Sequence, residues 1–182
     1  QHELAMAHTV FAGLGYKEIP EQFIQAIVKD VAMHKVGHTL GLRHNFKASK
    51  MLTLKEMCDP NKTRNGMVAS VMDYNPTLIV PKSWKQGDYY TTTIGPYDYW
   101  AIEYGYKPLS GGTEGEVKEL QKIASRSGED QLRFATDEDT IGTDPDTADA
   151  PTLYQYDAAD RLTSLANHMF FAAGMSIVVM FA

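Results

Sequence analysis

The sequence predicts one mostly helical domain with long loops and little sheet. Its 182 residues, 43% of them hydrophobic, suit a single globular core. Apolar residues recur at helical spacing in separate stretches, whereas turn-forming residues are frequent between 47 and 94, above all in "CDPNKTRNG" at 58–66. These patterns favour a few helices that are joined by long irregular segments.

Two helices are expected near the start of the chain, a short one over 3–14 and a clearer one over 20–41. Pro20 suits a first helical turn, and Glu21 places negative charge at the positive end of the helix dipole. Gly41 is a natural C-terminal cap because glycine readily adopts a left-handed conformation. Apolar residues repeat with a helical period at Phe23, Ile24, Ile27, Val28, Val31 and Ala32.

Further helices are expected in the second half of the chain. Gly95 and Pro96 open a helix over 95–106, and Thr113 followed by Glu116 has the spacing of a capping box for another. The acidic, turn-rich stretch 136–151 is expected to be a solvated surface loop. It does not fit a calcium-binding EF-hand, because an alanine stands where the final bidentate glutamate is required.

Composition and chain ends limit the possible partners. The net charge of −6, with no basic stripe, argues against a nucleic-acid partner. Cys58 has no second cysteine to pair with, and we expect it to be an inert thiol. The chain begins at Gln1 without a leader pattern, which is typical of a fragment or a processed product. The apolar stretch 169–182 is shorter than the roughly 20 residues of a membrane span, so we expect a buried segment or a non-native tail.

Three histidines suggest a metal site. His34 and His38 lie four residues apart, so both rings can leave the same face of a helix. Gly41 allows the chain to turn, and His44 can then return as a third ligand. Three protein ligands leave one zinc coordination position open, as in catalytic sites. The alternative is three unrelated histidines, but histidine is scarce in this chain, at 6 of 182 residues.

The segment "HKVGHTLGLRH" at 34–44 resembles the extended zinc motif H-E-x-x-H-x-x-G-x-x-H of metzincin metalloproteases. The segment "SVMDY" at 70–74 resembles their Met-turn, in which Met72 would lie beneath the metal. The segment "IGPYDYWAIEYGY" is similar to the helix that follows this turn. Together these segments look closest to the bacterial Met-zincin or EcxA-type zinc-binding domains.

The resemblance implies an α+β fold of the metzincin (zincin) type, of which this chain would hold the mostly helical part. Metzincins place a substrate-aligning sheet before the zinc helix, and we expect that sheet to be missing here. A chain without it is also compatible with a fragment that forms no working cleft. The implied division is an upstream remnant at 1–19, a zinc-binding core at 20–108 that contains the helix 20–41, the Met-turn 70–74 and the helix 95–106, and a C-terminal part at 109–182.

The resemblance also implies zinc-dependent hydrolysis of a peptide or protein substrate, in a secreted, periplasmic or cell-envelope setting. The family's general base is the glutamate that follows the first histidine, and here that position is Lys35. A protonated lysine has three donors and no acceptor, so we expect strongly impaired activity with zinc still bound. A neutral lysine acting as the base is the less fitting alternative. Natural inactivation and a single recent change are both compatible with Lys35.

A second class of function stays open, namely a non-catalytic zinc-binding pseudoprotease that binds a peptide or a protein partner. The resemblance implies that Tyr74 stabilises an oxyanion, although a packed tyrosine is the alternative. Asn45 is expected either to orient the site or to serve as a plain turn residue. Asp73 is a further candidate, which would hold a histidine N–H.

Overall fold

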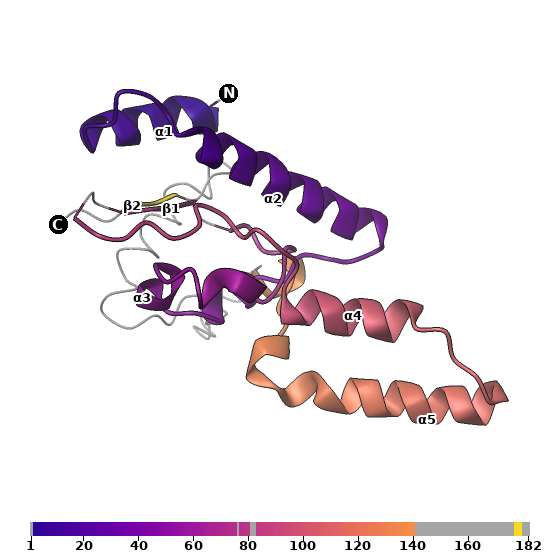
Figure 1. Cartoon of the computed structure of the whole chain (residues 1–182). Coiled ribbons are helices and arrows are strands. Elements are labelled where there is room, and N and C mark those ends of the chain that lie inside the picture. Colours follow the sequence, from indigo (N-terminus) through magenta and orange to yellow (C-terminus); the bar gives the residue numbers. More distant parts are fainter. Residues whose placement is uncertain (1, 76, 81–82, 141–176, 180–182) are drawn as a thin grey trace, which may run out of the picture.

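Helices dominate the computed structural model, which describes residues 2–75, 77–80, 83–140 and 177–179 (Figure 1). This mostly helical architecture with little sheet confirms the sequence prediction. The α-helices are α1 (His2–Gly13), α2 (Glu21–Thr39), α3 (Leu54–Met57), α4 (Pro96–Tyr106) and α5 (Gly112–Ala124). The 3-10 helices are η1 (Ala48–Lys50), η2 (Thr63–Asn65), η3 (Ser125–Gly128), η4 (Asp130–Leu132) and η5 (Asp137–Thr140).

The two described strands, β1 (Thr77–Ile79) and β2 (Ile177–Val179), form a small parallel sheet. Thr77 is opposite Ile177, so a piece of the apolar C-terminal stretch pairs with a segment about 100 residues earlier. The flanking parts of 169–182 lie outside the described residues. Figure 1 shows this sheet between α1 and α2 on one side and α3 on the other.

Strand β1 separates two hydrophobic clusters. Successive side chains of a strand point to opposite faces, so Leu78 and Ile79 enter different clusters. The Leu78 cluster also contains Ala48, Met67, Val68, Ala69, Val80, Tyr97 and Leu132. The Ile79 cluster also contains Ala7, Phe11, Phe23 and Tyr90. The second cluster fixes the first half of α2 against β1, and this helix carries two of the three histidines singled out above.

Helix α2 ends in a left-handed turn. Leu40 is its C-terminal cap residue, and Gly41 follows with a φ of 81°, a conformation that glycine adopts without steric cost. The N–H of Leu42 donates back to the carbonyl of Gly37 at 3.1 Å, which closes the turn. The helix therefore stops at Thr39, and the next residues can bend back toward it.

The predicted capping box at Thr113 is wrong. Helix α5 begins at Gly112, and Gly111 precedes it with a φ of 96° and no side-chain cap. A left-handed glycine turn therefore sets the start of this helix. A capping box lies instead at α3, where Thr53 and Glu56 bond to each other's backbone N–H groups at 3.4 and 3.0 Å.

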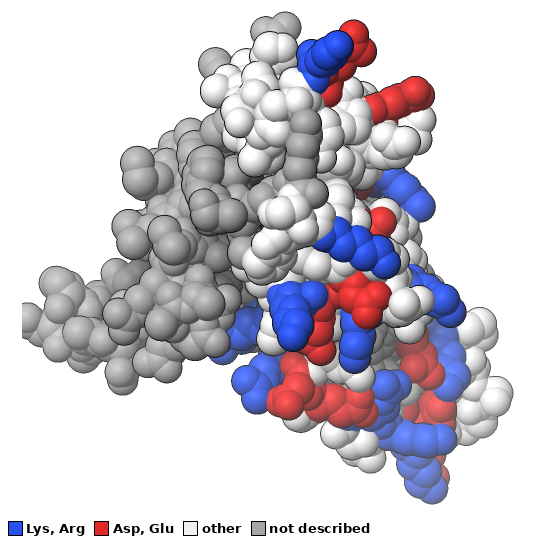
Figure 2. Space-filling model, turned by 60° about the vertical axis from the view of Figure 1, so that its left-hand side comes forward, with Lys and Arg blue, Asp and Glu red and all other residues white. Residues whose placement is uncertain are grey.

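Helices α4 and α5 lie side by side (Figure 1). The indole N–H of Trp100 donates to the carbonyl of Ile123 at 2.8 Å, and Lys107 pairs with Glu119 at 2.7 Å. On the face shown in Figure 2, acidic and basic side chains are intermixed. Among the described residues, no helix is both long enough and apolar enough to cross a membrane.

Truncation of Phe23 should weaken the fold considerably. Its ring is 1% exposed and packs edge-to-face on Phe11 and Tyr89, with ring centroids 5.3 and 5.4 Å away. We expect Phe23→Ala to lower the free energy of unfolding by about 3–5 kcal/mol. Val28→Ala, on the same helix but 63% exposed, should change it by less than about 0.5 kcal/mol. Urea denaturation measures both, and equal losses would contradict this description of the core.

Candidate metal centre

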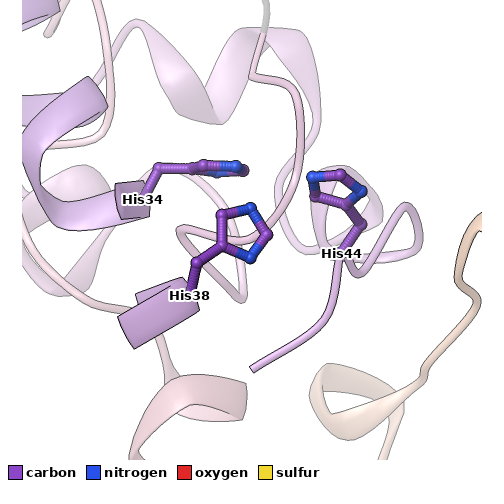
Figure 3. Close-up of side chains that lie close together, drawn as sticks. All are labelled: His34, His38 and His44. Carbon is purple, nitrogen blue, oxygen red and sulfur yellow. The ribbon is translucent and has the colours of Figure 1, made fainter. Parts of the chain in front are cut away.

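The structure brings His34, His38 and His44 together. Each ring offers one nitrogen, and these three atoms lie within 4.8 Å of one another. His34 and His38 extend from neighbouring turns of α2, and His44 reaches back from the segment that follows the Gly41 turn (Figure 3). Within the described ranges, this is the group of His, Cys, Asp or Glu side chains with the geometry to hold a metal ion.

Backbone carbonyls fix the rings of His34 and His38. The Nδ1 atom of His34 lies 2.7 Å from the carbonyl oxygen of Val71, and that of His38 lies 3.0 Å from the carbonyl oxygen of Leu42. A carbonyl oxygen can only accept a hydrogen bond, so Nδ1 must carry the proton in both rings. In a neutral ring this leaves the lone pair on Nε2, the tautomer that a metal requires.

A carboxylate fixes the third ring. The Nδ1 atom of His44 lies 3.0 and 3.1 Å from the two carboxylate oxygens of Asp137. The hydrogen bond from His44 lowers the pKa of Asp137 below its ordinary value, so this group is ionised at neutral pH. Nδ1 of His44 therefore donates, and Nε2 is again the free nitrogen. Of the acidic loop predicted over 136–151, residues 141–151 lie outside the described residues, and the half-exposed Asp137 contacts His44.

Burial favours the neutral form of the His34 ring. The residue is 7% exposed, and this burial is the main cause of a pKa below the ordinary 6.5. The positive charges that His38, His44 and Lys35 can carry act in the same direction. A lowered pKa keeps the imidazole neutral, and the neutral form is the one that binds a metal. His38 and His44 are more open to solvent, so the site is closed on the His34 side.

Met72 packs directly against the zinc-motif helix. Its side chain is fully buried, and a Cβ atom placed on Gly37 would collide with the Met72 sulfur. Gly37 lies between the two histidines of α2, so this close approach puts the thioether against the backbone of the site. The sequence reasoning missed Gly37. A signal was present, because glycine within a helix costs about 1 kcal/mol and usually marks a packing constraint.

A buried carboxylate holds the turn that carries Met72. Asp98 is 2% exposed and accepts hydrogen bonds from the Ser70 hydroxyl at 2.5 Å and from the Val71 N–H at 2.8 Å. It also accepts from the N–H of Gly95 at the start of α4, again at 2.8 Å. Burial raises the pKa of Asp98 above its ordinary value, although these three donors oppose the shift. The sequence reasoning did not single out Asp98.

Asn45 joins three segments rather than touching a ring. It is fully buried, its backbone N–H donates to the carbonyl of Met72 at 3.0 Å, and its side-chain amide donates to the carbonyl of Arg133 at 3.0 Å. Its side-chain oxygen accepts from the N–H of Ala135 at 3.3 Å. Asn45 therefore holds the backbone next to His44 in place.

The hypothesis that Asp73 holds a histidine is wrong. Its carboxylate accepts from the backbone N–H groups of Ser49 and Tyr74, each at 2.8 Å. Burial raises the pKa of Asp73 to about 6, while these hydrogen bonds act in the opposite direction. The Nδ1 atoms of His34, His38 and His44 bond instead to Val71, Leu42 and Asp137, respectively.

Tyr74 and Lys35 are solvent-exposed neighbours of the histidines. The Tyr74 ring is 47% exposed, and its centroid lies 4.6 Å from that of His44 and 5.8 Å from that of His34. Burial of part of the side chain raises the pKa of its hydroxyl, which therefore keeps its proton at neutral pH. Lys35 is exposed on α2, directly after His34.

The contact between Gly37 and Met72 predicts a change of sign in a double-mutant cycle. Gly37→Ala should destabilise the metal-free protein by about 1–3 kcal/mol, because the new methyl group displaces Met72. In a Met72→Ala background the same change should be neutral or stabilising by up to about 1 kcal/mol, as alanine favours helices. Urea denaturation of the four proteins measures this. The same loss in both backgrounds would contradict the contact.

Comparison with known proteins adds one finding. A family model described as Met-zincin matches residues 16–167, a range that includes the three histidines, Met72 and Asp137. No curated protein and no solved structure shows a significant match. Because the family model covers most of the sequence, the chain belongs to the Met-zincin family.

Proposed function

We propose that the chain carries a zinc site of the metallopeptidase type, and that Lys35 strongly reduces peptide hydrolysis by this copy. The observation that carries the proposal is the arrangement of the three histidines. Each Nδ1 donates to an acceptor of the chain, so the three Nε2 atoms are left for one metal ion.

The donor set favours zinc with an open position. Three neutral imidazoles are a common set for catalytic Zn²⁺, whereas calcium and magnesium prefer oxygen ligands. Cys58 is not part of the cluster: its thiol donates to the carbonyl of Leu54, and burial raises its pKa. Zinc bound in such a site polarises a peptide carbonyl and activates water.

The chain's own residues would support hydrolysis except at one step. Tyr74, whose ring centroid lies 4.6 Å from that of His44 and whose hydroxyl keeps its proton, would donate a hydrogen bond to an oxyanion. The Met72 side chain packs against α2 at Gly37. Lys35 stands where a general base is needed, and its ammonium group has no lone pair with which to accept a proton. The resulting loss in rate is about 10²–10⁴-fold.

A non-catalytic zinc module is the second candidate. It would bind a peptide or protein segment at the same site without cleaving it. Lys35 itself favours this function, because the base is replaced while the ring anchors, the Gly41 turn and the Met72 contact all remain. Both candidates require zinc, and they differ in whether restoring a carboxylate at position 35 restores cleavage.

Metal analysis tests what the two candidates share. We expect one zinc per chain after dialysis against buffered zinc, and a large loss of zinc in His38→Ala. His8→Ala is the matched control, because His8 is exposed on α1 and outside the cluster. Mass spectrometry of the metal content gives the answer. Equal zinc in the wild type and His38→Ala would refute the site.

Cleavage of unfolded casein separates the two candidates. Lys35→Glu should raise the cleavage rate about 10²–10⁴-fold, because a carboxylate can accept the proton of the attacking water. Lys35→Gln should give no such gain, since it removes the positive charge without supplying a base. If Lys35→Glu binds one zinc and still cleaves nothing, the result favours the non-catalytic module.

A further inference from the structure

We propose that Asp137 is a positioning residue for His44, and that it sets the affinity of the site for zinc. The inference rests on the zinc site proposed above and adds a fourth side chain to it. This carboxylate comes from a segment 93 residues further along the chain, after α5 and η4.

The segment that carries Asp137 is fixed against the segment that carries His44. The N–H of Phe46 donates to the carbonyl of Ala135 at 2.8 Å. Asn45 binds this returning segment twice, through its amide to the carbonyl of Arg133 at 3.0 Å and through its oxygen to the N–H of Ala135 at 3.3 Å. These three bonds lie within two residues of His44 on one side and within four residues of Asp137 on the other.

The carboxylate is also held within its own segment. The hydroxyl of Thr136 donates to Asp137 at 3.4 Å. The guanidinium of Arg43 lies 3.8 Å from the same carboxylate. The side chain of Asp137 is 50% exposed, yet both of its oxygens stay within 3.1 Å of His44 Nδ1. The contact is therefore preorganised by backbone on both sides.

The His44 ring depends more on a side-chain hydrogen bond for its orientation than the rings of His34 and His38 do. His34 and His38 belong to a regular helix and donate to backbone carbonyls, whereas His44 lies on irregular chain beyond Gly41. An ionised carboxylate is a stronger acceptor than a carbonyl, and it increases the electron density on the opposite ring nitrogen. Asp137 therefore fixes the orientation of this ring and makes its Nε2 a better ligand.

Zinc affinity tests the role of Asp137. We expect Asp137→Ala to raise the zinc Kd about 10–100-fold, and Asp137→Asn to have a smaller effect because an amide oxygen still accepts the hydrogen bond. Asp139→Asn is the matched control: it lies in the same turn but bonds Thr136 and not His44, so its Kd should stay within about twofold of the wild type. Competition with a chromophoric chelator measures all four proteins.

A second readout separates positioning from a merely structural role. Long-range ¹H–¹⁵N NMR of the metal-free protein should show His44 protonated on Nδ1 in the wild type and in Asp139→Asn. In Asp137→Ala the proton should shift toward Nε2 on His44, whereas His34 and His38 keep it on Nδ1. A structural role would instead lower the melting temperature and leave the tautomer and the Kd unchanged, which would overturn the inference.

The outcomes also distinguish the two proposals. A wild-type chain that binds no zinc overturns the proposed function, and this inference falls with it. Tight zinc binding by the wild type and by Asp137→Ala alike overturns the role of Asp137 alone.

Discussion

The structure depends on one constraint: three imidazoles must keep Nδ1 bonded to the chain so that Nε2 stays free. The backbone of Val71, which bonds the His34 ring, shows how the chain fixes a ring. The Val71 carbonyl accepts from His34, while the Val71 N–H donates to the buried Asp98. Asp98 in turn bonds Gly95 at the start of α4, so the placement of the His34 ring is linked to a helix that begins about 60 residues further along the chain. A shift of the Val71 carbonyl or of the Asp98 carboxylate would therefore change the orientation of the His34 ring.

The packing of Met72 against α2 also helps to hold the histidine rings in this arrangement. The Met72 thioether occupies the space that a side chain at Gly37 would take. Glycine weakens α2 at this position, but it allows the close contact with Met72. The two faces of β1 carry separate hydrophobic clusters, and one of them holds α2 through Phe23. The three rings are thus positioned by the turn that carries Met72, by helix α2 and by the segment that carries Asp137. The site is open to solvent on the side of His38 and His44. Lys35 is the residue that departs from the hydrolytic pattern within this otherwise intact arrangement.

What the sequence could predict depends on how local each signal is. The histidine spacing, the Gly41 turn and helix α2 follow from short-range periodicity, and the mostly helical architecture follows from their sum. Asp137 and Asp98 could not be found this way, because their partners lie 93 and 27 residues away and no period connects them. Asp73 was a candidate for holding a histidine N–H, whereas its carboxylate bonds backbone N–H groups. The capping box at Thr113 failed because Gly111 and Gly112 offered a left-handed start that no side chain needed to cap.

X-ray absorption at the zinc edge tests the central claim most directly, because it reports the atoms around the metal whatever the protein catalyses. Our account predicts three imidazole rings with nitrogen at about 2.0–2.1 Å and a light atom in the remaining position. Their multiple-scattering pattern should lose one ring when His44 is replaced by alanine. A sulfur atom at about 2.3 Å, or a spectrum with a single imidazole, would contradict the account.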